Sequence, residues 1–375
     1  MVENPLRSLS KFGQSIWLDY ISRQLIESGQ LAEMIKSDAL KGMTSNPSIF
    51  QKAISKSTDY NEDIAEIVRN GGTPDSAYEL ISQKDVRTAA DEFRCVFDAT
   101  NGLDGYVSLE VNPHLAYDTQ ATIDEAKRLW ASLGRQNVFI KVPSTIEGLD
   151  AIEQIISEGI NVNVTLLFSV PRYRKVVDSY FSGLEKRLEQ GKSIDSIASV
   201  ASFFLSRIDS KVDPILSKII EQGDEKKDTA QKVYGQTAVS SAKIAYQVCK
   251  ELHSSKRFKK LEVEGARQQR LLWASTSTKN PEFDDVKYVE ELIGSNTVNT
   301  MPPETVDAYR DHGNPRFRLE QDLEFADWVL QQHQVLGINL EQICQELEDE
   351  GVKKFIKPFD DLMHTLKSSI EKLSD

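Results

Sequence analysis

One strand-like run, Asn137-Val138-Phe139-Ile140-Lys141-Val142-Pro143-Ser144-Thr145, sets the interpretation of the whole chain. Its β-branched and apolar residues predict a buried strand with Lys141 near the end. A buried ammonium is costly to desolvate, so an apolar wall favours the neutral amine, a nucleophile that forms Schiff bases with carbonyls. Taken alone, Lys141 is explained as simply by a side chain that extends from the strand end to water.

Composition narrows the class of protein. The 375 residues suffice for one large core or two domains, and 27% charged and 39% hydrophobic residues are typical of a soluble globular protein. The net charge of −13 disfavours nucleic acid or an anionic membrane as the main partner, but it permits a local basic pocket for a small phosphate. No apolar run approaches the ~20 residues of a membrane span, and residues 1–10 lack the apolar segment of a signal peptide.

Cysteine and histidine usage predicts a reduced, cytoplasmic protein without a metal. The three cysteines are far apart and show neither a metal-binding spacing nor a disulfide framework, and the five histidines form no cluster. The oligomeric state, monomer or homodimer, stays open. The residues concerned are Cys95, Cys249, Cys344, His114, His253, His312, His333 and His364.

Short strand-like segments alternate with longer amphipathic ones along the chain. The helical segments include 145–159, 171–190, and one for which Thr122 is the expected cap. This alternation predicts parallel βα units. The expected strands are 15–21, 39–44, 105–111, 137–142, 162–168, 199–205, 271–275 and 295–300.

Eight such units predict one (β/α)8 barrel domain that spans residues 1–375. A barrel needs about 250 residues, so we assign the excess to helical insertions at 60–100 and 211–268 and to a C-terminal helical extension, 317–375, packed on the barrel. In the extension, 325–336 and 359–373 are amphipathic. An open doubly wound sheet is the rival architecture, but no glycine-rich nucleotide loop follows any expected strand.

The expected strand ends carry an unusual set of polar side chains. In a barrel these ends meet at one face and form the active site. Each residue also has a structural explanation: Asp19 could cap a helix, Glu110 could pair with a surface lysine, and Arg207 could pair with Asp209. A barrel enzyme accounts for all of them together. The set is Asp19, Asn46, Glu110, Lys141, Asn163, Thr165, Ser202, Phe204, Arg207, Ser275 and Lys279.

Schiff-base cleavage of a carbon–carbon bond fits this set. Lys141 would attack a ketose carbonyl, and Glu110 would act as acid and base through a water held by Thr165. Asp19 would take a hydroxyl proton as the bond breaks, while Asn46 and Asn163 would orient the sugar. A phosphate would be held by Arg207 with Ser202, Ser275 or Lys279.

The chain resembles the transaldolases, specifically their longer bacterial-type subgroup, from about Ser8 to about Glu304. A lone Thr-Ser-Asn-Pro would be weak, but five motifs in the family's order are highly specific. They are Trp17-Leu18-Asp19, Thr44-Ser45-Asn46-Pro47-Ser48-Ile49-Phe50, Ser108-Leu109-Glu110-Val111, Ile140-Lys141-Val142-Pro143-Ser144-Thr145-Ile146-Glu147-Gly148 and Gly159-Ile160-Asn161-Val162-Asn163-Val164-Thr165-Leu166-Leu167-Phe168-Ser169.

The resemblance implies a (β/α)8 barrel without metal or organic cofactor. It implies transfer of a dihydroxyacetone unit from sedoheptulose 7-phosphate to glyceraldehyde 3-phosphate in the pentose phosphate pathway, giving erythrose 4-phosphate and fructose 6-phosphate. Within the motifs the Schiff-base lysine, the two acid/base carboxylates and the holder of the catalytic water match Lys141, Asp19, Glu110 and Thr165. The sugar binders match Asn46 and Asn163, and the phosphate side of the pocket matches Ser202, Phe204 and Arg207.

The sequence departs from the family pattern after the seventh expected strand. Many members have an arginine soon after Ala-Ser, whereas this chain reads Ala274-Ser275-Thr276-Ser277-Thr278-Lys279. Lys279 would replace a forked guanidinium with a point charge. Two other functions remain open: a fructose 6-phosphate aldolase, which releases free dihydroxyacetone, and a barrel that binds sugar phosphates without catalysis.

Overall fold

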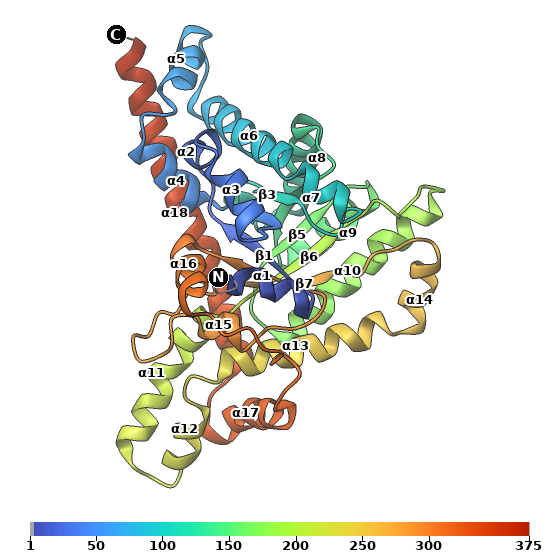
Figure 1. The fold of residues 1–375 in the computed structure, drawn as a ribbon, viewed down its shortest axis with the longest axis vertical. Coiled ribbons are helices and arrows are strands. Elements are labelled where there is room, and N and C mark those ends of the chain that lie inside the picture. Colours follow the sequence, from blue (N-terminus) through green and yellow to red (C-terminus); the bar gives the residue numbers. More distant parts are fainter. Residues whose placement is uncertain (1–3, 375) are drawn as a thin grey trace.

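Eight parallel strands close into a barrel in chain order, β1 to β8, in a computed structural model that describes residues 4–374 (Figure 1). All eight strands predicted from the sequence are confirmed, with ends that differ by a few residues, and the open doubly wound sheet is wrong. The strands are β1 Gln14–Asp19, β2 Gly42–Thr44, β3 Tyr106–Glu110, β4 Val138–Pro143, β5 Val162–Leu167, β6 Ser199–Phe204, β7 Arg270–Ala274 and β8 Thr297–Met301.

Helices surround this barrel, and α8, α9 and α10 each follow a strand as its crossover. The helix expected to begin at Thr122 begins earlier, because Asp118 caps it and Thr122 instead bonds to the Leu115 carbonyl. The helices are α1 Pro5–Leu9, α2 Arg23–Glu27, α3 Gln30–Ser37, α4 Pro47–Lys56, α5 Asn61–Arg69, α6 Pro74–Glu92, α7 Arg94–Ala99, α8 Thr119–Leu133, α9 Ile146–Ser157, α10 Val170–Glu189, α11 Ser206–Gln222, α12 Lys227–Val233, α13 Thr237–His253, α14 Lys256–Val263, α15 Lys287–Glu290, α16 Pro303–His312, α17 Leu323–Leu336 and α18 Leu340–Ser374, with short 3₁₀ turns at Ser10–Phe12 and Pro113–Leu115.

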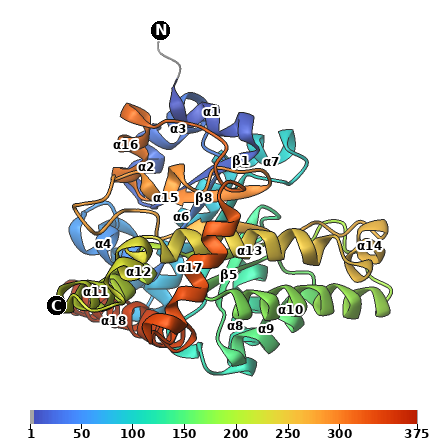
Figure 2. The same ribbon diagram turned by 90° about the horizontal axis from the view of Figure 1, so that it is seen from below.

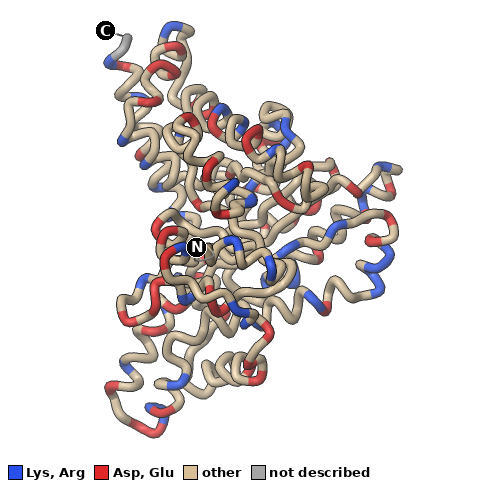
Figure 3. Tube along the Cα trace, in the orientation of Figure 1, with Lys and Arg blue, Asp and Glu red and all other residues tan. Residues whose placement is uncertain are grey.

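The extra helices lie where the sequence has excess length. Helices α5 to α7 cover the first predicted insertion, and α12 to α14 cover most of the second; Figure 2 shows α10 and α13 extending together towards α14. The helical segments predicted in the tail fall within α17 and α18, and α18 packs along α4, α5 and α6 (Figure 1). Basic and acidic residues are interspersed over these helices (Figure 3). Within residues 4–374 no helix has a stretch long and apolar enough to cross a membrane.

A buried polar cluster fills the N-terminal end of the barrel interior. Arg270 on β7 pairs with Asp104 at 3.0 Å and donates to the Ser15 hydroxyl at 2.7 Å. Asp104 also accepts hydrogen bonds from Ser15 at 2.7 Å and from the Trp17 indole at 3.2 Å. Since charged partners inside a protein must satisfy one another, this cluster fills the end of the barrel opposite the carboxyl ends of the strands.

An aromatic layer lies directly above that cluster. The Trp17 ring is 6.0 Å from the Phe139 ring and 6.4 Å from the Tyr106 ring, so three strands share one packed layer. Gly42 on β2 leaves room for this layer, because a Cβ there would lie 2.6 Å from the Trp17 indole. The layer supports the next residues along each strand, which face the opposite, open end.

Gly42→Ala should therefore destabilise the barrel by about 1–3 kcal/mol, the usual cost of overpacking a rigid core. Urea unfolding followed by circular dichroism measures this loss. In a Trp17→Leu background the same substitution should cost less, since the ring that it meets is gone. An equal cost in both backgrounds would place the strain elsewhere.

Candidate active site

A polar cavity of about 610 Å³ opens at the carboxyl ends of the strands. Most of its lining comes from strand ends and from the loops and helix starts that follow them, as expected for a barrel. Of the eleven side chains predicted from the strand ends, nine line this cavity, and Glu110 and Asn163 are buried on strands next to Lys141. The nine are Asp19, Asn46, Lys141, Thr165, Ser202, Phe204, Arg207, Ser275 and Lys279.

Lys141 lies inside the barrel wall with only 4% of its surface exposed. Its Nζ donates to the Ser45 carbonyl at 2.9 Å and is 3.5 Å from Glu110 Oε2. The register of β3 and β4 places Glu110 directly opposite Lys141, so the pair is a consequence of strand pairing. The interpretation in which Lys141 extends to bulk water is wrong.

Glu110 is a carboxyl group suited to hold a proton near neutrality. Burial raises its pKa to about 7, and the Lys141 charge opposes that rise. Its Oε2 atom has no hydrogen-bond partner among the described residues. A buried oxygen of this kind is ready to bond a water or a substrate group.

Thr165 carries a second unsatisfied oxygen on the other side of β4. Its hydroxyl is fully buried, lines the cavity and bonds to no described residue. The strand is irregular here: the register against β6 shifts between Val164 and Leu167, and Leu166 has a positive φ of 57°. Such bulges occur next to active sites because they re-aim a side chain. No sequence pattern predicted the bulge at Leu166.

Asp19 ends a chain of hydroxyl groups that crosses the barrel closure. Thr44 donates to its Oδ1 at 2.7 Å, and the Thr300 hydroxyl is 2.7 Å from that of Thr44. Because Thr44 uses its hydrogen on the carboxylate, Thr300 must donate to Thr44. Burial raises the pKa of Asp19, while the Lys141 charge and the Thr44 hydrogen bond oppose the rise. Thr44 and Thr300 were not predicted as site residues.

The two predicted asparagines lie in different environments. Asn163 is completely buried, donates to the Ser108 hydroxyl at 3.1 Å and accepts from the Ser202 hydroxyl at 2.7 Å. Asn46 caps α4 by accepting from the Ile49 amide at 3.1 Å, which leaves its own NH₂ without a described partner. Asn46 is thus both the cap of α4 and part of the cavity wall.

Among the described residues, Arg207 contacts two aromatic rings and pairs with no acid. Its guanidinium carbon is 5.1 Å from the Phe204 ring centroid and 5.9 Å from that of Phe355, and burial lowers its pKa. Its Nη1 is buried without a hydrogen bond in the described chain. The alternative pairing with Asp209 is wrong, because Asp209 bonds to the Tyr288 hydroxyl at 2.8 Å and pairs with Lys287.

Two candidates for anion binding follow β7. Ser275 has a positive φ of 55°, and its hydroxyl is 2.9 Å from that of Ser206, the first residue of α11. Lys279 is exposed at the cavity edge and donates to the Ser277 hydroxyl at 2.6 Å. A buried amine between two carboxyl groups, with cations at the cavity edge, can form a Schiff base with a phosphorylated carbonyl compound.

Comparison with known proteins agrees with this chemistry. The family model for transaldolase/fructose-6-phosphate aldolase matches residues 16–366. The chain belongs to this family. A transaldolase of Trichodesmium erythraeum is 47% identical over 378 residues, which cover 100% of both chains. Transaldolases of Thermobifida fusca and Saccharopolyspora erythraea are 45% and 43% identical, and the matches cover 96% and 98% of both chains.

Several cavity residues of this family member escaped the sequence argument. Lys52 comes from α4, Glu304 from α16, and Lys354 and Phe355 from α18. All of them lie on helices, whereas the prediction considered strand ends. The C-terminal helix could not be placed over the barrel mouth from its amphipathic pattern alone.

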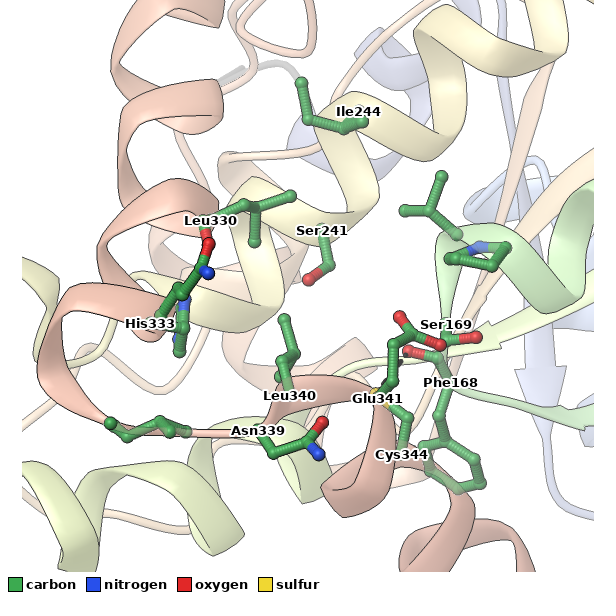
Figure 4. Close-up of a pocket in the computed structure, with 15 residues that line it drawn as sticks. Phe168, Ser169, Ser241, Ile244, Leu330, His333, Asn339, Leu340, Glu341 and Cys344 are labelled. Carbon is green, nitrogen blue, oxygen red and sulfur yellow. Dashed lines mark hydrogen bonds between the residues drawn. The ribbon is translucent and has the colours of Figure 1, made fainter.

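A second cavity, of about 570 Å³, lies between α10, α13, α17 and the start of α18 (Figure 4). No lysine or arginine lines it, so it offers neither a Schiff-base amine nor a strong phosphate ligand. At the surface, Asp284, Asp285 and His312 bring possible metal-ligand atoms within 4.8 Å of one another. His312 pairs there with Asp285 at 2.9 Å, which raises its pKa and favours a proton on the ring.

Proposed function

We infer that this protein is a transaldolase. It transfers a dihydroxyacetone unit from sedoheptulose 7-phosphate to glyceraldehyde 3-phosphate, giving erythrose 4-phosphate and fructose 6-phosphate in the pentose phosphate pathway. The observation that carries this conclusion is the buried Lys141 amine 3.5 Å from Glu110 in a polar, sugar-sized cavity, in a chain similar over its whole length to named transaldolases. We also propose that it acts in the cytoplasm and that residues 317–375 extend a single barrel domain, 1–375.

The first half of the reaction makes the Schiff base. The Lys141 amine attacks the ketose carbonyl carbon, and the resulting carbinolamine loses its hydroxyl as water. Glu110 supplies the proton for that departure and later takes one back when water hydrolyses the product Schiff base. The unsatisfied oxygens of Glu110 and Thr165 support a shared water as the carrier.

The second half breaks and remakes the carbon–carbon bond. Asp19 takes the proton from the C4 hydroxyl, the C3–C4 bond breaks, and its electron pair passes into the iminium to leave an enamine on Lys141. The departing fragment becomes an aldose. The enamine then attacks the acceptor aldehyde, and Asp19 returns the proton to the new hydroxyl. The hydroxyl chain from Thr44 and Thr300 holds Asp19 in place for both transfers.

Other residues bind the sugar and its phosphate. The free NH₂ of Asn46 orients substrate hydroxyls, and Asn163, locked by Ser108 and Ser202, supports the floor beneath Lys141. The buried, unpaired edge of Arg207 receives the phosphate. Ser275 and Lys279 complete that subsite from the loop after β7.

Turnover of fructose 6-phosphate should depend on an acceptor aldose. With erythrose 4-phosphate present, a coupled assay should report glyceraldehyde 3-phosphate formation, because the enamine is released by attack on the acceptor. Without the acceptor the steady-state rate should fall by at least tenfold. Equal rates with and without acceptor would identify an aldolase that releases free dihydroxyacetone.

Borohydride reduction in the presence of fructose 6-phosphate should leave a three-carbon adduct on Lys141. Peptide mass mapping locates it. Lys141→Met should remove the adduct and keep the fold, since methionine has a similar length and avoids a buried charge. Lys279→Met, the same change elsewhere in the cavity, should still be labelled on Lys141. An adduct at another lysine, or none in the wild type, would refute the assignment.

The acidic limb of the pH profile of kcat/KM should bend at an apparent pKa of about 7, the value to which burial raises the pKa of Glu110. Below it, Glu110 holds its proton and cannot accept the proton that the amine gives up as the carbinolamine forms. The rate should therefore rise with pH through this value. In Glu110→Gln the bend should disappear and the rate should fall by about 10²–10⁴-fold. A bend that persists near pH 7 in the variant would assign it to another group.

A further inference from the structure

Arg207 faces the cavity without any polar group that fixes its direction. In residues 4–374 it forms neither an ion pair nor a side-chain hydrogen bond, and its guanidinium lies against the aromatic rings of Phe204 and Phe355. An arginine that is meant to bind phosphate gains from this arrangement, because a carboxylate partner would compete with the phosphate for the N–H groups. The rings therefore control where the guanidinium edge points.

The two rings come from different parts of the molecule. Phe204 ends β6 and belongs to the barrel, whereas Phe355 lies in the middle of α18, the long C-terminal helix. Both phenylalanines also line the cavity. We propose that Phe355 is a positioning residue of the active site, through which α18 orients Arg207 towards the substrate phosphate. The proposal rests on the transaldolase function inferred above.

Helix α18 is anchored on both sides of Phe355, as a positioning element must be. Before it, Cys344 donates to the Phe168 carbonyl at 3.3 Å; Figure 4 shows the two residues side by side. The Phe168 ring in turn is 5.2 Å from the Phe204 ring. After it, Phe359 packs edge-on against Tyr78 of α6 at 5.3 Å. The helix thus contacts the same aromatic cluster that holds the barrel side of Arg207.

A glycine brings this helix close to the catalytic strand. A Cβ at Gly351 would lie 2.8 Å from the Leu166 side chain, which belongs to the bulge that follows Thr165. A larger residue there would require Leu166 or α18 to shift. The close approach sets the depth at which Phe355, one helical turn later, reaches Arg207.

The test compares two phenylalanines of one helix. Phe355→Leu keeps a buried apolar side chain but removes the ring, and Phe359→Leu makes the same change at a residue that does not line the cavity. We expect Phe355→Leu to lower kcat/KM about fivefold for the acceptor glyceraldehyde 3-phosphate, the size of one partly desolvated cation–π contact. The value for unphosphorylated glyceraldehyde should stay within twofold. Phe359→Leu should leave kcat/KM for both acceptors unchanged. Phe355→Tyr, which keeps a ring, should restore the preference for the phosphorylated acceptor.

Binding of inorganic phosphate gives a readout that does not depend on turnover. Isothermal titration should show about fivefold weaker phosphate binding in Phe355→Leu. In an Arg207→Met background the Phe355→Leu change should have no further effect, because the group that it positions is gone. If the wild type lacks transaldolase activity but this pattern holds, the proposed function fails while the positioning role stands.

Three results would overturn the proposal. One is an equal loss for phosphorylated and unphosphorylated acceptors. Another is an equal loss in Phe355→Leu and Phe359→Leu. The last is an additive effect of Phe355→Leu in the Arg207→Met background, which would show that the ring acts on some other group. Circular dichroism and thermal unfolding check that each variant is folded.

Discussion

The register of the closed barrel is the constraint on which the site depends. Parallel pairing places Glu110 opposite Lys141 and Lys141 opposite Asn163, so the amine, its acid and its supporting amide are neighbours by strand geometry. Since side chains alternate between the two faces of a strand, a one-residue slip would turn all of them outward. Beneath them the ring layer at Trp17 and the Arg270–Asp104 pair fill the interior and hold that register.

The same strands also bring together charged groups that affect the pKa of Asp19 and Glu110. Burial raises the pKa of both Asp19 and Glu110, and the charge of Lys141 opposes that rise on both acids. Glu110, whose pKa burial raises to about 7, can therefore give or take a proton near neutrality. Placing the three groups on strands of one closed, rigid barrel keeps their separations fixed while protons move, which lowers the reorganisation needed during the reaction.

Local patterns were enough to predict the strands and the polar residues at their ends, because each such residue is placed by its own strand. What they could not predict depends on contacts between distant segments. The bulge at Leu166 arises where β5 meets β6, and Phe355 reaches the cavity only because α18 crosses the barrel mouth. Arg207 was considered as a partner of Asp209, but the packing of α13 and α15 gives Asp209 other partners, the Ala238 amide and the Tyr288 hydroxyl.

The Lys141 end of the cavity needs more precise side-chain placement than the phosphate-binding end, and the chemistry at each end explains this difference. Bond making at Lys141 requires sub-ångström placement, and Asp19, Glu110, Lys141 and Thr165 all stand on strands of the closed sheet. Phosphate binding acts through charge, which falls off slowly with distance. That end is assembled from helices and a loop: Arg207 on α11, Lys279 after β7 and Phe355 on α18. Sequence change in the helical tail would therefore alter affinity for the phosphate before it altered the Schiff-base step.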